Sequence, residues 1–256
     1  MKKLCTILLI AVMLTACGSG DNGRTFNDYK DFEGETIGVP QGNLAVDVIR
    51  DNIKGTPGLY PDVNAALADI RSGEIAGFIT DLSVVNAVAA AHEDFKVIPV
   101  PAEIFSGPLG AFASEQGLID EFNAFLAELQ ADGTLADMQK RWLEDVPNAD
   151  TEMPEIEFSD ENGMLTIAAT SDSMPFTYVE NNTRKGYSIE LGKRFALSMG
   201  MEWNFIIMEF SELIDFVAEG NAMLGLDAVT ITSERAEKVI FSDSIYDETL
   251  GILTLK

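Results

Sequence analysis

The sequence predicts an α/β fold in which mostly parallel sheets are flanked by helices. Three observations support this prediction. Short buried strands alternate with amphipathic helices along both halves of the chain, a pattern typical of parallel sheets. Apolar residues make up 46% of the 256 residues, which excludes a disordered chain. After the N-terminal leader about 230 residues remain, enough for one two-lobed unit or two small domains.

Residues 1–17 have the features of a signal peptide. A basic start precedes an apolar run at 4–14, which is too short to cross a bilayer as a helix. The ending Leu-Thr-Ala-Cys resembles a bacterial lipobox, which implies a lipid on Cys17; the alternative is an ordinary secretory signal with an incidental cysteine. Residues 18–26 would then be a flexible tether. We therefore expect an extracytoplasmic protein that its lipid anchors to a bacterial membrane.

Charge and cysteine content exclude several classes of function. The formal net charge is −25, and loss of the two leader lysines takes it to about −27. Such a chain lacks the clustered Lys and Arg that nucleic acid binding needs, and it will not adhere to anionic lipid by charge. Cys5 leaves with the leader and Cys17 carries lipid, so no disulfide or thiolate metal site is expected.

Residues 27–106 alternate between strand and helix patterns. Asp62 caps a helix whose apolar residues recur at i, i+3, i+4 and i+7 until Gly73 ends it. Asp81 lies where a buried strand stops and a helix begins. The expected elements are strands at 36–39, 75–80 and 96–100 and helices at 44–52, 62–73 and 83–91.

Residues 107–145 predict one strand and two helices. The strand is expected at 107–113, and an apolar stripe between 118 and 129 has helical spacing. Gly133 ends that helix, and Thr134 with Asp137 forms a pattern like a capping box for the next one. That helix ends near Trp142, which we interpret as a packing residue.

Residues 146–162 are expected to be an extended acidic linker. They contain two prolines and six acids with no Lys or Arg, and they show no periodicity. A second α/β stretch follows in residues 163–256. Its expected elements are strands at 165–169, 203–208, 224–229 and 250–255 and helices at 188–199 and 211–219.

The stretch around Arg235 has the composition of an anion site. An apolar strand runs into Thr230 and Thr232, and a helical turn opens at Ser233. Ligands of open α/β sheets lie at the carboxyl ends of strands, and the guanidinium matches a carboxylate with two parallel hydrogen bonds. The alternative is that Thr232 or Ser233 only caps the turn while Arg235 pairs with Glu234 or Glu237 on the surface.

Five linked motifs make residues 165–255 resemble the first lobe of bacterial family 3 solute-binding proteins, the receptors of polar amino acid ABC importers. They follow one another in the family's order and spacing. The motifs are Pro-Phe-Thr-Tyr at 175–178, Lys-Gly-Tyr-Ser-Ile-Glu-Leu at 185–191, Glu-Phe-Ser at 209–211, Thr-Ile-Thr-Ser-Glu-Arg at 230–235 and Phe-Ser at 241–242. Residues 27–106 resemble the second lobe, and 107–145 resemble its return strand and terminal helices.

The resemblance implies a two-lobed periplasmic-binding-protein-like fold of type II and a set of ligand contacts. Arg235 and Thr230 would bind the carboxylate of an amino acid. Asp81, next to Thr80, would bind its ammonium group together with Asp172, and the alternative for Asp81 is a plain helix N-cap. Further implied contacts are the backbone donors of Gln41, Gly42 and Asn43, the aromatic Phe210 and Ala228, which replaces a frequent glycine.

The order of the lobes is unusual for that family. Here the second lobe and the terminal helices precede the linker, and the first lobe (163–256) follows it. This order indicates a circular permutant; the rival explanation is a fragment of a tandem receptor array. In a permutant cut at the hinge, one crossing between lobes would remain near residues 105–110. The loosened hinge would then favour micromolar affinity.

The resemblance implies a receptor that delivers an amino acid to ABC permease subunits. One alternative is a ligand-sensing or interaction module without transport. Another is a periplasmic dehydratase resembling cyclohexadienyl dehydratase. The lone His92 is expected to be exposed at a helix end, and the sequence has no nucleophile elbow, metal cluster or Walker loop. We therefore expect no catalytic residue, cofactor or metal.

Overall fold

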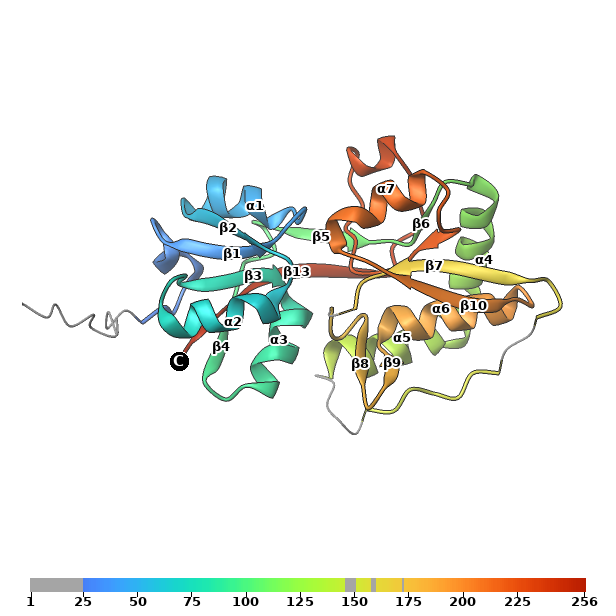
Figure 1. The fold of residues 1–256 in the computed structure, drawn as a ribbon, viewed down its shortest axis with the longest axis horizontal. Helices are drawn as coiled ribbons and strands as arrows, with labels where there is room; N and C mark the ends of the chain where they lie inside the picture. The colour runs from blue at the N-terminus through green and yellow to red at the C-terminus, as the bar shows by residue number, and fades with distance from the viewer. Residues whose placement is uncertain (1–24, 146–150, 158–159, 172) are drawn as a thin grey trace, which may run out of the picture.

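The computed structural model describes residues 25–145, 151–157, 160–171 and 173–256, and in these the chain forms two lobes (Figure 1). Each lobe contains one mixed sheet with helices packed against it, which confirms the predicted α/β class. We refer to the six-stranded sheet and its helices as the N-terminal lobe, and to the five-stranded sheet and its helices as the C-terminal lobe.

The N-terminal lobe has the strand order β2-β1-β3-β13-β4, with β5 paired to β13. Both ends of helix α2 are determined by neighbouring residues in the sequence. Asp62 accepts a hydrogen bond from Ala65 N at 3.0 Å, and Gly73 ends the helix in a left-handed conformation. The strands are β1 (Thr36–Pro40), β2 (Thr56–Tyr60), β3 (Gly77–Asp81), β4 (Phe95–Pro99), β5 (Ser106–Leu109) and β13 (Tyr246–Leu255); the helices are a 3-10 turn (Tyr29–Phe32), α1 (Ala45–Val48) with a π-helical continuation (Ile49–Ile53), α2 (Val63–Ser72) and α3 (Leu82–Ala91).

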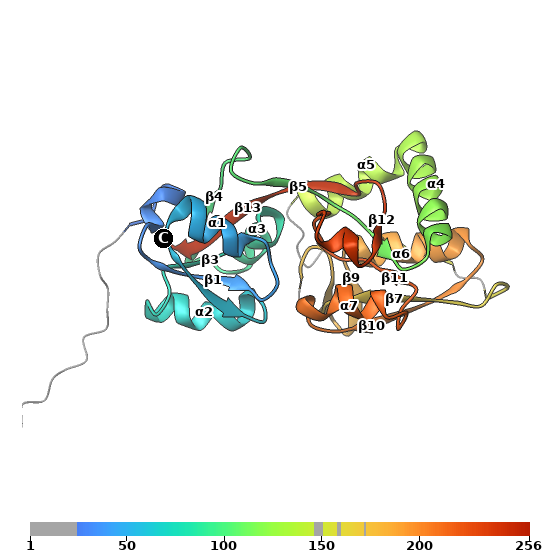
Figure 2. The same ribbon diagram turned by 90° about the horizontal axis from the view of Figure 1, so that it is seen from above.

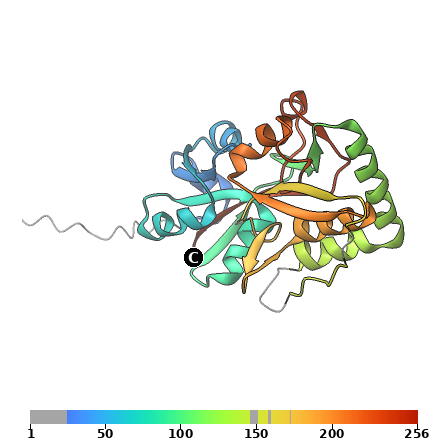
Figure 3. The same ribbon diagram turned by 45° about the vertical axis from the view of Figure 1, so that its right-hand side comes forward.

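The C-terminal lobe has the strand order β10-β7-β11-β6-β12. Figure 3 shows α4 in green on the side of this lobe that faces away from the N-terminal lobe. The strands are β6 (Phe112–Ala113), β7 (Met164–Ala169), β10 (Glu202–Ile207), β11 (Leu224–Gly225), β12 (Ile240–Phe241) and a separate hairpin of β8 (Tyr178–Glu180) and β9 (Thr183–Lys185); the helices are α4 (Gln116–Asp132), α5 (Thr134–Gln139) with a π-helical continuation (Lys140–Glu144), α6 (Tyr187–Ser198), α7 (Leu213–Ala218) and 3-10 turns at Phe210–Glu212 and Arg235–Glu237.

The two sheets share one topology, and each is completed by a strand from the other half of the sequence. In both, three parallel strands are followed by one reversed strand and then a last strand. The reversed strand is β13 in the N-terminal lobe and β6 in the C-terminal lobe. Strand 250–255 was expected within the lobe of residues 163–256, and it lies instead between β3 and β4. Its apolar residues complete the other core.

The chain crosses between the lobes twice, so the expected loss of one crossing is wrong. The first crossing leads from β5 to β6, and the second leads from β12 to β13. The two crossings run side by side as an antiparallel pair, with Ser106–Leu109 opposite Tyr246–Thr249 (Figure 2). A hinge with both strands intact removes the physical reason for expecting weak, micromolar binding.

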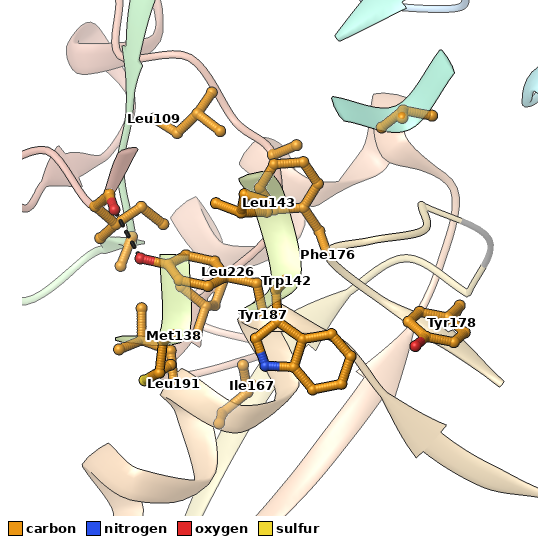
Figure 4. Packing of buried hydrophobic residues seen from close by; sticks show 14 of the residues in the cluster. Leu109, Met138, Trp142, Leu143, Ile167, Phe176, Tyr178, Tyr187, Leu191 and Leu226 are labelled. Carbon is orange, nitrogen blue, oxygen red and sulfur yellow. Dashed lines mark hydrogen bonds between the residues drawn. The ribbon is translucent and has the colours of Figure 1, made fainter. Parts of the chain in front are cut away.

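The start of β13 is fixed to the C-terminal lobe by two side chains. Tyr187 Oη donates to the carbonyl of Ile245 at 2.7 Å, drawn as a dashed line in Figure 4, and Gln139 Nε2 donates to the same oxygen at 2.9 Å. Trp142 is fully buried beside them, as expected of a packing residue. The helices α5 and α6 therefore hold the hinge strand where it enters the lobe.

Three local predictions differ from the structure. Gly133, and not Thr134, precedes α5, and Asp132 accepts the Thr134 N–H at 2.8 Å, so there is no Thr134–Asp137 capping box. The strand expected at 107–113 is split at Gly110, whose N–H donates to Val229. Strand β11 ends at Gly225; the backbone of Leu226 still donates to Ala168, and Asp227 then accepts from Thr170 through its side chain.

Replacing Gly225 by alanine should destabilise the C-terminal lobe. A Cβ at this position would lie 2.2 Å from the ring of Phe112, which is fully buried and cannot move aside. Overpacking of this kind costs about 1–3 kcal/mol, or about 2–4 °C in melting temperature per kcal/mol. In the control, Gly117→Ala on α4, nothing lies within 4 Å, so stability should be unchanged or slightly higher. Equal melting temperatures for the two variants would contradict this account of packing.

Candidate functional site

A cleft lies between the two lobes, at the carboxyl ends of their parallel strands. Most of its lining residues come within a few positions of such a strand end. The lining follows β1 (Pro40, Asn43), β2 (Pro61, Asp62, Val63), β3 (Thr80, Asp81), β7 (Thr170, Ser171, Ser173), β10 (Met208, Glu209, Phe210) and β11 (Ala228), with Phe78 and Val84 beside them.

Asp81 is the most distinctive group in this cleft. Its residue is 7% exposed, and it occupies the N-cap position of α3 without a capping hydrogen bond from its side chain. Among the described residues, no side chain or neighbouring backbone donates a hydrogen bond to its carboxylate. Burial and the nearby Glu248 and Asp227 carboxylates raise the pKa of Asp81 well above its ordinary value, and Arg235 opposes this shift.

The two buried carboxylates near Asp81, those of Asp227 and Glu248, accept hydrogen bonds. Asp227 is fully buried and accepts from the backbone N–H of Thr170 at 2.8 Å and from its hydroxyl at 2.7 Å. Glu248 on β13 accepts from the Ser83 hydroxyl at 2.5 Å. Burial raises the pKa of both groups, and these hydrogen bonds oppose the rise. Asp81 is therefore the member of the cluster that lacks a partner.

Arg235 links the two lobes beside the cleft. Its Nη1 donates to the carbonyl of Thr230 at 2.8 Å, and its Nη2 donates to the carbonyl of Gly42 in the other lobe at 3.2 Å. The guanidinium lies 5.8 Å from the ring centre of Phe210. It lines an adjoining pocket with Gly42 and Lys238, and Phe210 lines both pockets. Burial lowers the pKa of Arg235, although Asp81 counteracts this.

The alternative reading of the Arg235 stretch is half right. Thr232 does cap the turn, since its Oγ1 accepts the N–H of Arg235 at 3.1 Å. The guanidinium, however, points toward backbone carbonyls between the lobes and forms no ion pair with Glu234 or Glu237 in the described part of the chain.

The backbone donors expected at residues 41–43 are largely occupied. Gln41 N donates to the carbonyl of Tyr60 at 2.9 Å, and Asn43 N donates to the carbonyl of Pro40 at 3.1 Å. The Asn43 side chain accepts the N–H of Ala45 at 2.9 Å, which closes the start of α1. The turn after β1 therefore uses two of the three expected donors internally, and an anion-binding role for the Gly42 N–H stays a prediction.

The remaining predicted residues divide between the cleft and its surroundings. Thr80, Asn43, Phe210 and Ala228 line the cleft. Thr230 does not; its backbone pairs with Leu109 at the hinge. Gln41 lines a neighbouring pocket, Asp172 and Cys17 lie outside the described residues, and His92 is half-buried against Phe95 where it was expected to be exposed.

Sequence reasoning missed Glu209, Ser171 and Met208 as lining residues, and it read Asp62 only as a cap. The signal was present in their position, since each follows the carboxyl end of a strand. Across the described ranges, the helices are too short or too polar to cross a membrane, and no group of three His, Cys, Asp or Glu side chains could hold a metal ion.

Comparison with known protein families gives a match in the C-terminal part of the chain. Residues 165–256 match the family model of bacterial extracellular solute-binding proteins, family 3. This segment contains β7, β10 and β11, whose carboxyl ends form one wall of the cleft, and the Arg235 turn, which lines the adjoining pocket. The family match therefore covers the C-terminal segment that contains the Arg235 turn.

Two relatives match parts of the chain. The arginine-binding extracellular protein ArtP of Bacillus subtilis (strain 168) is 33% identical over 92 residues, which is 36% of each chain. The L-cystine-binding protein TcyJ of Escherichia coli (strain K12) is 28% identical over 127 residues, 48% of this chain and 47% of that one. The chain thus spans about a third to a half of the length of these relatives.

A phosphate-binding protein of a phosphate ABC transporter from Streptococcus pneumoniae TIGR4 aligns over 87% of this chain and 89% of its own, with 14% sequence identity and a TM-score of 0.45.

Proposed function

We propose that the chain is an extracytoplasmic solute-binding protein that captures an amino acid in the cleft between its lobes. The observation that carries this proposal is the unpartnered, buried Asp81 in one wall of the cleft, with Arg235 from the other lobe close enough to act on it electrostatically. A carboxylate and a guanidinium contributed by different lobes match the ammonium and carboxylate groups of a zwitterion.

Binding would change the contacts of Arg235. In the structure, Nη2 of Arg235 donates to the carbonyl of Gly42 in the other lobe. A ligand carboxylate is a stronger acceptor than a backbone carbonyl, so it would take over this donor while Asp81 receives the ammonium group. Each buried charge then has a partner, and the lobes gain a reason to close on the ligand.

We further propose that a lipid on Cys17 anchors the protein and that it delivers its ligand to the permease subunits of an ABC importer. The family 3 match of residues 165–256 and the names of the relatives as amino acid-binding proteins support this role. We also propose a circularly permuted order of lobes. In support, each strand position in the two sheets is occupied by one strand. This is expected of one rearranged receptor and not of the halves of two different receptors.

A thermal-shift screen of the twenty amino acids tests the proposed function. A receptor gains stability from its ligand by mass action, about 2.7 kcal/mol at a hundredfold excess of ligand over Kd. Arg235→Ala should lose most of that gain. The matched control is Arg71→Ala on α2. This change removes an exposed ion pair between Arg71 and Asp94 outside the cleft.

The control variant should keep the full ligand-induced shift even if its own melting temperature falls slightly. The proposal is wrong if no amino acid raises the melting temperature of the unaltered protein, or if Arg235→Ala and Arg71→Ala respond alike to the ligand.

A further inference from the structure

We propose that the cleft selects a ligand with net positive charge, a basic amino acid carrying a second cationic group on its side chain. This inference rests on the proposed function and assigns the substrate class of the same site. It follows from the carboxylates that both lobes contribute to the cleft, and from the position of Arg235, whose guanidinium already donates to two backbone carbonyls.

The lining of the cleft carries three carboxylates and, among the described residues, no Lys, Arg or His. Asp62 and Asp81 belong to the N-terminal lobe, and Glu209 faces them from the C-terminal lobe. Asp227 and Glu248 lie close enough behind Asp81 to raise its pKa. When the lobes approach, these like charges repel one another unless a cation enters between them.

Asp81 supplies the independent sign of a missing ligand. It is more than nine-tenths buried, it lines the cleft, and no other described residue donates a hydrogen bond to its carboxylate, which receives only the N–H of its own backbone. A buried carboxylate without a partner costs free energy in the unliganded protein. A bound ammonium group removes that cost, so this side chain favours ligands that bring a cation.

Counting charges separates a zwitterion from a basic ligand. Arg235 and Asp81 balance the carboxylate and the ammonium group of any amino acid. Glu209 and Asp62 are then left over in the lining of the cleft. Among the described residues, the Asp62 carboxylate accepts a hydrogen bond only from the backbone N–H of Ala65, which is a neutral donor. A second cation on the ligand would offset this excess negative charge, whereas an acidic side chain would add to it.

A metal ion does not fit the same carboxylates. In the part of the chain that the structure describes, no three His, Cys, Asp or Glu side chains lie close enough to hold one. The cleft is also lined by Phe78, Val84, Met208 and Phe210, whose apolar surfaces suit the methylene groups of an organic cation.

Calorimetry with L-lysine, L-arginine, L-glutamine and L-glutamate tests the inference on the full protein. We expect the two basic amino acids to bind at least tenfold more tightly than L-glutamine, and L-glutamate to bind most weakly. Glu209→Gln should weaken L-lysine binding about threefold to fivefold, because its partly solvated charge is screened. Binding of L-glutamine by this variant should not weaken.

The matched control is Glu212→Gln, which removes an equal charge three residues after Glu209. The Glu212 side chain lines none of the pockets described above. Its affinity for L-lysine should equal that of the unaltered protein. Tighter binding of L-glutamine or L-glutamate than of L-lysine overturns the inference while leaving the proposed function in place. So does an equal effect of Glu209→Gln and Glu212→Gln.

Cadaverine, the diamine that lacks the carboxylate of L-lysine, separates this inference from the proposed function. Weak binding of cadaverine beside tight binding of L-lysine supports both. Binding of cadaverine with no binding of any amino acid supports a cation-selective cleft but rejects an amino acid receptor. Binding of neither cation rejects selection for positive charge.

Discussion

Replacing Asp81 by asparagine should abolish ligand binding and at the same time raise the melting temperature of the unliganded protein. The loss of binding should be at least about 100-fold in Kd, because a buried charge that pairs with the ligand is removed. The gain in stability should be about 1 kcal/mol or more, since asparagine has the same shape but no buried charge. At about 2–4 °C per kcal/mol, thermal unfolding resolves this change.

The sign of the pH dependence follows from the direction of the Asp81 shift. Burial, Glu248 and Asp227 raise the pKa of Asp81 in the folded protein above its unfolded value. The stability that this group contributes is therefore fully present below the unfolded pKa, about 3.9, and is lost as the pH rises through the folded pKa. Asparagine does not titrate, so its advantage should be small near pH 4 and grow toward pH 8.

Thermal unfolding of both proteins at pH 4, 6 and 8, with and without ligand, measures these effects. A variant that is less stable than the unaltered protein at pH 8 would contradict the unpartnered state of Asp81. A variant that retains the ligand-induced shift would remove Asp81 from the binding site, whatever its stability.

Replacing Glu190 by alanine should lower the stability by about 3 kcal/mol, or about 6–12 °C. Glu190 on α6 is fully buried and accepts from Arg141 at 2.6 Å, from Trp142 Nε1 at 2.7 Å and from Arg194 at 2.9 Å. It thus joins the turn after α5 to α6. Alanine would leave the buried indole N–H of Trp142 without an acceptor and two cations without their common partner.

The Glu190 contribution should disappear in acid, opposite to that of Asp81. Burial acts to raise the pKa of Glu190, but hydrogen bonds from Arg141, Trp142 and Arg194 outweigh it, and the pKa is lower than usual. A lowered folded pKa gives stability that is present above the unfolded pKa, about 4.3, and is lost as the pH falls through the folded pKa. The unaltered protein and Glu190→Gln should therefore converge in stability as the pH falls.

The control for Glu190 is Asp94→Asn, which breaks the exposed pair with Arg71. Both partners of that pair are more than two-fifths exposed, so the variant should lose less than about 1 kcal/mol. If the two carboxylate variants lose equal stability at pH 7, or if the Glu190→Gln difference stays constant between pH 7 and 3, the buried network does not stabilise the lobe as described.

Local elements were predictable where the signal lies within a few residues. Helix α2 is an example, because Asp62 and Gly73 fix its two ends through bonds to their own neighbours. Strand β11 was predicted too long for the opposite reason. Residues 226–229 are all buried like a strand and three of the four are apolar, but the Asp227 carboxylate binds Thr170 where the chain leaves the sheet. No local pattern reports that contact across 57 positions.

The candidate site was predicted in part for the same reason. Asp81 and the turn at Arg235 end or follow strands, which sequence patterns reveal. The occupation of the Gln41 and Asn43 donors depends on how the turn after β1 folds back on Tyr60 and Pro40. The second crossing was missed because β13 pairs with β3 and β4, more than 140 positions earlier, as the registers Leu250 with Asp81 and Leu255 with Phe95 show.

The anchoring of Ile245 determines how the lobes can move. Its carbonyl is held by Tyr187 and Gln139, and from Leu250 onward β13 is enclosed in the N-terminal sheet. Rotation of one lobe against the other is therefore confined to the short ribbon where Tyr246–Thr249 pairs with Ser106–Leu109. Any closure must therefore twist that ribbon, and Glu248 within it ties the ribbon to the N-terminal lobe by accepting from Ser83 on α3.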